Sequence, residues 1–185
     1  QINAVLPFSI KAEWQLVEDK DWSQEWKKHF KPIPCSEGRL WICPSWLEAP
    51  EPNAVNLRLD PGLAFGTGSH PTTRLCLQWL ERQLAHLVPD LSSDRRPSVL
   101  DYGCGSGILA IAAMKLGAGS AIGVDIDAGA VLAARDNAIR NQVPCEFVTL
   151  PELTPPPTLQ VDLLLANILA NPLRVLAPVL AAHTR

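Results

Sequence analysis

Residues 99–107 read Val99-Leu-Asp-Tyr-Gly-Cys-Gly-Ser-Gly107, and no other segment says as much about the architecture. An apolar strand ends in three glycines, at 103, 105 and 107, and a helical pattern follows over 108–116 until Gly117. Glycines let the backbone turn tightly and bring main-chain N–H groups close to a ligand. The segment therefore predicts a strand, a ligand-binding turn and a helix in succession.

The glycine spacing indicates the kind of ligand. The dinucleotide fingerprint is GxGxxG, whereas this turn is GxGxG preceded by the acidic residue Asp101. A tighter turn beside a carboxylate suits a cofactor without a pyrophosphate, and S-adenosylmethionine, with its ammonium, carboxylate and sulfonium groups, is such a molecule. The alternative is a glycine turn that serves only the packing of the strand on the helix.

Outward from this turn, short apolar strands alternate with helical patterns. Strands are expected at 98–101, 121–125, 145–150 and 161–166, and helices at about 72–87, 108–116 and 128–140, with Asn171 as cap and Pro172 as first residue of a last helix. Such alternation is typical of a parallel sheet that is buried on both faces. The predicted fold class is α/β, a Rossmann-like open parallel sheet with helices on both faces.

The N-terminal part shows a different pattern. A short amphipathic helix over 21–30 and two strands, 38–43 and 56–59, are expected there, and five of the six tryptophans lie in the first 46 residues. The tryptophans are interpreted as packing residues rather than as a binding platform.

Composition and charge restrict the class of protein. The chain has 185 residues, of which 47% are hydrophobic and 19% charged, and this excludes a disordered tail or a coiled coil. A net charge of −3 argues against direct nucleic-acid binding through a general basic field. Five dispersed cysteines without a CxxC pair indicate reduced thiols and no metal site. No signal peptide or membrane span is expected, so the predicted location is cytoplasmic.

Two further positions are candidates for the same site. Asp125 ends the second strand 22 residues after Gly103, where a ribose-binding acid is expected, and Asp127 is interpreted as the cap of the next helix. Asn167 follows the fourth strand, and carboxyl ends of parallel strands share one edge of a sheet. Asn167 is expected to orient an amine or hold the cofactor; the alternative is a turn-forming Asn.

The loop over 59–73 leads into the first long helix. Thr72 or Thr73 is expected to cap that helix, and a hydroxyl there also lies within reach of a cofactor carboxylate. The residues alone do not separate the two threonines. His70 is interpreted as structural rather than as a general base.

Four strings resemble one methyltransferase family. LDPGLAFGTGSHPTT, VLDYGCGSGILAIAAMKLGA, VDIDAGAVLAARDNAIRN and ANILANPL are similar to the bacterial enzymes that modify ribosomal protein eleven of the large subunit, the PrmA family. The likeness runs from about Trp22 to the end. One departure is Ser69, where the family commonly has Thr.

The resemblance implies a function. It implies an S-adenosylmethionine-dependent protein methyltransferase that acts on lysine side chains and the N-terminal amine of that ribosomal protein, its expected partner. It also implies cofactor-binding roles for Thr73, Gly103, Asp125 and Asn167. From the residues themselves, Gly105 of the same turn is expected to bind the cofactor, and Asn167 is expected to be the catalytic residue that orients the amine.

The resemblance also implies an incomplete domain. Residues 1–50 are expected to be a linker and N-terminal extension packing on the core, and residues 51–185 a C-terminally incomplete methyltransferase domain, truncated after the fourth core strand. The strand at 161–166 then becomes a sheet edge, and weak or absent turnover is expected.

Two rival functions stay open. One is another amino- or amide-directed methyltransferase, although Asn-Ile-Leu-Ala stands where those enzymes usually carry Asn-Pro-Pro-aromatic. The other is an inactive cofactor-binding fragment.

Overall fold

The computed structural model of the chain describes residues 27, 30–36, 39–60, 68–88, 95–150 and 158–185. Contacts between Cα atoms divide the chain into two units, Gln1–Phe30 and Lys31–Arg185. All helices and strands below belong to the second unit. The helix expected over 21–30 and the FGTG part of the loop at 59–73 lie outside the described residues, apart from Lys27, Phe30 and Gly68.

The main sheet has four parallel strands. They are β4 (Ser98–Tyr102), β5 (Ser120–Asp125), β6 (Glu146–Thr149) and β7 (Leu163–Leu165), in the spatial order β6-β5-β4-β7. β4 pairs with β5 on one side and with β7 on the other, both parallel. The predicted open parallel sheet is therefore confirmed, and β7 forms one of its edges, as expected.

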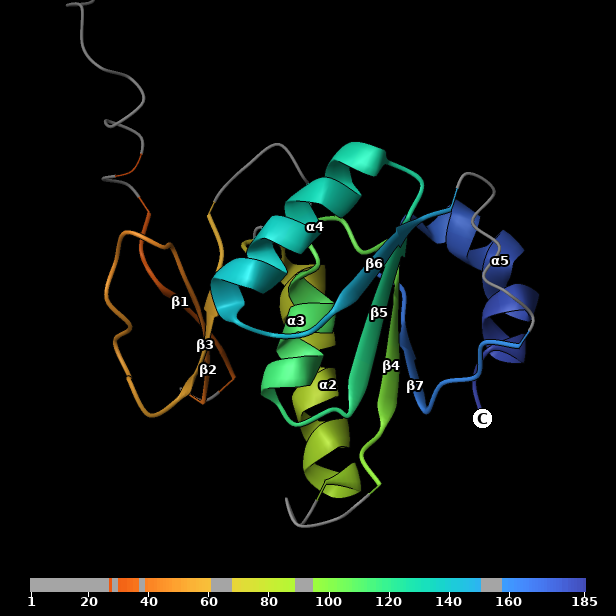
Figure 1. Cartoon of the computed structure of the whole chain (residues 1–185), viewed down its shortest axis with the longest axis horizontal. Coiled ribbons are helices and arrows are strands. Elements are labelled where there is room, and N and C mark those ends of the chain that lie inside the picture. The colour runs from red at the N-terminus through yellow and green to blue at the C-terminus, as the bar shows by residue number, and fades with distance from the viewer. Residues whose placement is uncertain (1–26, 28–29, 37–38, 61–67, 89–94, 151–157) are drawn as a thin grey trace, which may run out of the picture. The chain divides into compact units, whose positions relative to one another are not determined.

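Helices cover both faces of this sheet (Figure 1). On one side lie α2 (Pro71–Leu87), α3 (Ile108–Lys115) and α4 (Ala128–Asn141), and on the other lies α5 (Ala170–Ala182). Alternate residues of β4 face the two layers: Val99 packs in the cluster with α2, α3 and α4, whereas Leu100 and Tyr102 pack in the cluster with Leu180 of α5. The two-residue period of the strand thus produces the two cores.

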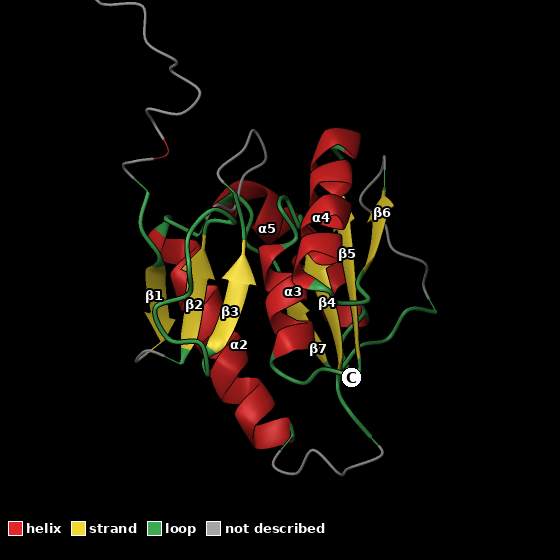
Figure 2. Ribbon diagram, turned by 60° about the vertical axis from the view of Figure 1, so that its left-hand side comes forward, coloured by secondary structure: helices red, strands yellow, loops and turns green. Residues whose placement is uncertain are grey.

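A second, smaller sheet covers the layer formed by α2, α3 and α4 (Figure 2). Its strands are β1 (Ile33–Ser36), β2 (Leu40–Cys43) and β3 (Val55–Arg58), with β1-β2 antiparallel and β2-β3 parallel. The strands predicted at 38–43 and 56–59 correspond to β2 and β3, whereas β1 was not predicted. Residues 33–36 and 40–43, assigned from sequence to the N-terminal extension, thus share a sheet with residues 55–58. The division of roles between residues 1–50 and 51–185 stays a prediction.

Two helix starts differ from the sequence-based expectation. His70 caps α2, since its Nδ1 accepts a hydrogen bond from the backbone N–H of Thr72 and Pro71 occupies the first helical position. The prediction of Thr72 or Thr73 as cap was therefore wrong. The prediction of Asn171 as cap of α5 was also wrong, because the helix begins at Ala170 with Leu169 as N-cap. Pro172 still lies in the first turn, where backbone N–H groups have no intrahelical partner.

Two further expectations concerned reduced cysteines and the absence of a membrane span. All five cysteines are free thiols, and Cys35, Cys43 and Cys104 are buried. Within the described part of the chain, no helix combines the length and the apolar character needed to cross a membrane.

Candidate functional site

The candidate site lies at the carboxyl edge of the main sheet. β4 is followed there by the glycine turn, β5 ends at Asp125, and β7 is followed by Asn167. Parallel strands place their carboxyl ends on one side, and ligands of open α/β sheets bind at that side. The sheet order puts β4 between β5 and β7, so the glycine turn lies between the other two segments.

Main-chain hydrogen bonds connect the glycine turn to the end of β5. The N–H groups of Gly103 and Cys104 both donate to the carbonyl oxygen of Val124, at 2.8 and 3.0 Å. Gly103, with φ of +73°, lies so close to Ile168 that a Cβ atom would overlap its Cγ2. Glycine is therefore required both by the left-handed backbone and by the approach to the segment after β7.

Asp125 binds the glycine turn directly. One carboxylate oxygen accepts from the N–H of Gly105 at 2.8 Å, and the other accepts from the N–H of Asp127 at 3.0 Å. Asp127 has a different task, because its own carboxylate accepts from the N–H of Gly129 and caps α4. The interpretation of Asp127 as a helix cap is confirmed, and Asp125 lies beside the turn.

Thr73 and Asn167 meet although 94 residues separate them. The Nδ2 group of Asn167 donates a hydrogen bond to Oγ1 of Thr73 at 3.1 Å. Thr73 is fully buried, whereas Thr72 is exposed. The phase of α2 thus distinguishes the two threonines, which the pattern of residues alone left open.

Asp101 is a buried acid that the sequence marked only as a neighbour of the turn. It lies next to the last residue of β4, and its carboxylate accepts from the N–H of Ala110 in α3 at 3.2 Å. Burial raises the pKa of the Asp101 carboxyl to about 7; the hydrogen bond from Ala110 lowers it and the charge of Asp125 raises it. The site edge therefore contains one carboxyl group that titrates near neutrality and is shielded from water.

Contacts link all five predicted site residues into one neighbourhood. Thr73 bonds to Asn167, Ile168 next to Asn167 contacts Gly103, and Gly105 bonds to Asp125. Their roles toward a cofactor stay predictions. The sequence reasoning missed the direct bond between Thr73 and Asn167, because no local pattern tells which of two distant polar side chains will meet.

Other features of the described chain lie apart from this edge. A cavity of about 650 Å³ opens between the small sheet and α2, with Arg39, Trp41 and Glu81 among its lining residues, and it includes none of the five. No group of three or more His, Cys, Asp or Glu side chains among the described residues is placed to hold a metal ion.

Solved structures with the same arrangement define the class. A ribosomal protein L11 methylase from Lactobacillus delbrueckii subsp. bulgaricus superposes with a TM-score of 0.70 and 36% identity, over 84% of this chain and 76% of that one. A T. thermophilus 16S rRNA N2 G1207 methyltransferase superposes with a TM-score of 0.55 at 22% identity, over 66% of this chain and 34% of that one, and it supports the fold alone. The fold, with its glycine turn after β4, is that of the methyltransferases.

The family follows from sequence. The model of the ribosomal protein L11 methyltransferase (PrmA) family matches residues 3–185, so the chain belongs to that family. A ribosomal protein L11 methyltransferase of Chromobacterium violaceum is 60% identical over 169 residues, covering 91% of this chain and 52% of the relative. The corresponding protein of Cellvibrio japonicus is 55% identical over 175 residues, which make up 94% of this chain and 55% of that protein. The chain spans about half the length of the curated relatives it matches.

Proposed function

We propose that the chain is the methyl-transfer part of an S-adenosylmethionine-dependent methyltransferase that modifies amino groups of ribosomal protein L11, namely lysine side chains and the N-terminal amine. The observation that carries the proposal is the hydrogen bond from Asn167 to Thr73 beside the glycine turn. It joins the start of α2 to the segment after β7, two parts of the chain that are 94 residues apart, at the carboxyl edge of the sheet. Membership of the family supports the choice of substrate.

The residues present fit the cofactor. The turn at Gly103 and Gly105 brings backbone close to the edge without side chains, which suits the amino-acid part of the cofactor. Asp125 accepts one backbone hydrogen bond on each oxygen, and a carboxylate has about four lone-pair sites, so acceptor capacity for two ribose hydroxyls remains. We assign Thr73 and Asn167 to the same pocket, since their polar groups lie beside the turn.

When bound, S-adenosylmethionine supplies an activated methyl group on a positively charged sulfur. The acceptor must be a neutral amine, yet a lysine with a pKa near 10.4 is only about 0.1% neutral at physiological pH. Removing water from the amine disfavours its charged form. Asn167, whose amide is fixed by its bond to Thr73, presents its oxygen as an acceptor for an amine N–H. Desolvation and orientation thus replace a strong base.

A binding experiment tests the cofactor. Calorimetric titration is expected to show binding of S-adenosylmethionine and no comparable binding of NAD. Asp125→Ala should abolish the binding, because it removes the ribose acceptor. Asp127→Ala is the matched control, since it removes a neighbouring carboxylate that caps α4, and it should leave the affinity within about twofold. Equal binding by both variants would contradict the role of Asp125.

A methylation assay tests the reaction. Transfer of labelled methyl groups to ribosomal protein L11 is expected to fall at least about a hundredfold in Asn167→Ala, with Asn171→Ala as a control at an exposed position of α5. Near-normal turnover of Asn167→Ala with intact cofactor binding would eliminate the catalytic role. Cofactor binding without any transfer by the parent chain would instead identify an inactive cofactor-binding fragment, the second rival function.

A further inference from the structure

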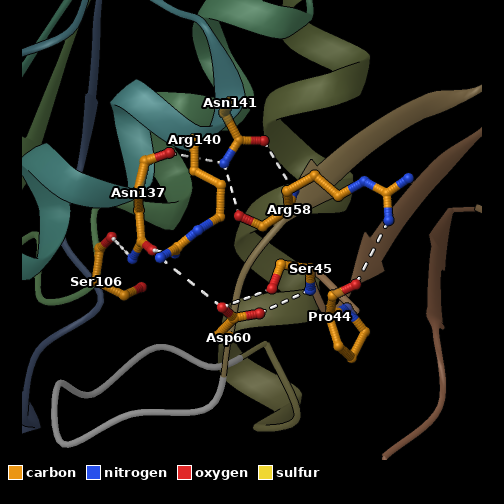
Figure 3. A network of polar contacts seen from close by, with 8 residues as sticks. All are labelled: Pro44, Ser45, Arg58, Asp60, Ser106, Asn137, Arg140 and Asn141. Carbon is orange, nitrogen blue, oxygen red and sulfur yellow. Dashed lines mark hydrogen bonds and ion pairs between the residues drawn. The ribbon is translucent and has the colours of Figure 1, made fainter. Parts of the chain in front are cut away.

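Two buried amide side chains face inward from the last turns of α4. Asn137 and Asn141 are only 7% and 4% exposed. A buried amide costs free energy unless its donors and acceptors are paired. Both are paired, and their partners lie on segments that belong to the candidate site or lead into it (Figure 3).

Asn141 makes the main-chain hydrogen bonds that a neighbouring strand would otherwise make to the end of β3. Its Oδ1 accepts from the backbone N–H of Arg58 at 2.8 Å, and its Nδ2 donates to the backbone carbonyl of Arg58 at 2.7 Å. Arg58 is the last residue of β3, and β3 is an edge strand of the small sheet. A single side chain therefore satisfies both main-chain groups at the end of that edge and fixes β3 to α4.

Asn137 reaches the glycine turn. Its Nδ2 donates to the carbonyl oxygen of Ser106 at 2.9 Å, between Gly105 and Gly107, and its Oδ1 accepts from Arg140 at 2.7 Å. The same turn lies against α4 at a second point, because a Cβ atom on Gly107 would come within 2.9 Å of the Ala134 side chain. A turn with three glycines has much backbone freedom to lose, so such fixed contacts matter more for it than for other turns.

Arg140 extends the connection to Asp60. Its guanidinium lies 3.8 Å from one carboxylate oxygen of Asp60, and that carboxylate also accepts from the N–H and Oγ of Ser45 at 2.7 and 2.8 Å. Asp60 follows β3 and stands at the start of the chain segment that leads to Thr73. Figure 3 shows the whole connection from Ser106 through Asn137 and Arg140 to Asp60.

We propose that Asn137 and Asn141 are positioning residues, which hold the glycine turn and the end of β3 on one helix so that the cofactor pocket is formed before the cofactor binds. The proposal rests on the proposed function and goes beyond it, because it assigns affinity to side chains that do not touch the cofactor. α4 is suited to this task, since it begins directly after Asp127, whose N–H donates to Asp125, and its last two turns carry the two asparagines.

Two variants separate the hydrogen bonds of Asn137. Asn137→Ala removes both bonds of that side chain, whereas Asn137→Asp keeps the acceptor for Arg140 but has no N–H for Ser106. Both are expected to weaken S-adenosylmethionine binding about tenfold, the effect of losing one hydrogen bond that orders the turn. Asp136→Ala, at the exposed neighbouring position of α4, is the matched control and should bind like the parent.

The readout must distinguish positioning from simple loss of stability. Affinity is therefore measured by calorimetry well below the melting temperature of each ligand-free variant, where the chain is folded. Amide hydrogen exchange of the ligand-free protein is measured in parallel, and Asn137→Ala should speed exchange at Gly105 and Gly107 about tenfold, whereas Asn141→Ala should do so at Arg58. A lowered melting temperature with unchanged affinity and unchanged exchange at the turn would overturn the proposal.

The two proposals fail in different ways. If the parent chain does not bind S-adenosylmethionine, the proposed function is wrong. Hydrogen exchange at the glycine turn then remains as the measurement that decides whether Asn137 holds the turn in place. If the parent binds and both Asn137 variants bind within twofold of it, the positioning role is wrong and the proposed function stands.

Discussion

At the scale of single residues, Asp101 combines a charge-bearing side chain with almost complete burial. Its pKa of about 7 lies far above the usual range of an aspartate, chiefly because water does not reach the carboxyl group. Between about pH 4 and pH 7 the folded chain holds a proton here that the unfolded chain has released. Stability contributed by the neutral carboxyl group is therefore lost as the pH rises through this window.

This linkage predicts how Asp101→Asn should behave. The amide is neutral at every pH, and its oxygen can still accept from the N–H of Ala110. The variant therefore does not lose the stability that the parent loses when its buried carboxyl group becomes charged. Its free energy of unfolding relative to the parent should rise between pH 4.5 and pH 8, by about 1.4 kcal/mol for each unit by which the pKa is raised. Urea unfolding at four or five pH values measures this, and two parallel pH profiles would show that Asp101 is charged throughout.

Gly103 gives a second prediction at this scale. Gly103→Ala places a Cβ atom against Ile168 and forces a left-handed backbone on a residue with a side chain, which together should cost about 2–4 kcal/mol of stability. In an Ile168→Ala background only the backbone part should remain, about 1–2 kcal/mol. Urea unfolding of the four proteins tests the separation, and an equal cost in both backgrounds would exclude the contact with Ile168 as a cause.

At the scale of secondary structure elements, the start of α2 depends on an unusual cap. The Nδ1 atom of His70 accepts from Thr72 N at 3.3 Å, a long hydrogen bond, while Pro71 leaves no N–H to satisfy at the first position. His70→Ala should destabilise the chain by about 1 kcal/mol, whereas His70→Asp should preserve or increase stability, because aspartate is a better N-cap beside the positive end of the helix. His86→Ala in the last turn of α2 is the matched control. Equal midpoints of urea unfolding for His70→Ala and the parent would contradict the capping role.

The elements also show how far the sequence predicts this structure. β4 to β7 and α2 to α4 were predictable because apolar runs, helical periods and the glycine turn are local signals. β1 was missed because it contains Pro34, which is rarely found inside a sheet; the structure accepts it because β1 is an edge strand paired only with β2. The cap of α2 was misassigned because threonine is a common N-cap and histidine is not.

The candidate site was likewise predictable where the signal is local and not where it depends on how distant segments pack. Asp125 and Asn167 were candidates because Asp125 ends β5 and Asn167 follows β7, and the carboxyl ends of parallel strands lie at the same edge of a sheet. The bond of Asn167 to Thr73 was not predictable, since it depends on how α2 crosses the sheet and on which face of α2 turns inward. The links from Asn137 and Asn141 were missed for a similar reason: on α4 these residues have the appearance of ordinary polar positions until β3 and the glycine turn are placed beside them.

At the scale of the whole molecule, the β7 side of the main sheet differs from the rest. β7 is the outermost strand, and the bridge between Val161 and Thr184 is the one pairing that the structure describes on its outer side. The helix on this side, α5, buries only Leu180 among its residues, while Leu169 before it and Val175 within it are both 78% exposed. Unpaired strand edges and exposed apolar side chains both favour association with other chains.

Association at this side should therefore depend on concentration. Sedimentation analysis of the chain is expected to show a shift toward larger species as the concentration increases, since β7 and α5 of two copies can cover each other's apolar surface. Replacing Leu169 and Val175 with lysine should shift the chain toward the monomer through charge repulsion. Ile139→Lys is the control, because Ile139 is 75% exposed but lies on α4, on the opposite side of the sheet. A monomer at all concentrations would contradict this expectation, and a shift caused by Ile139→Lys would place the contact on α4 rather than at β7.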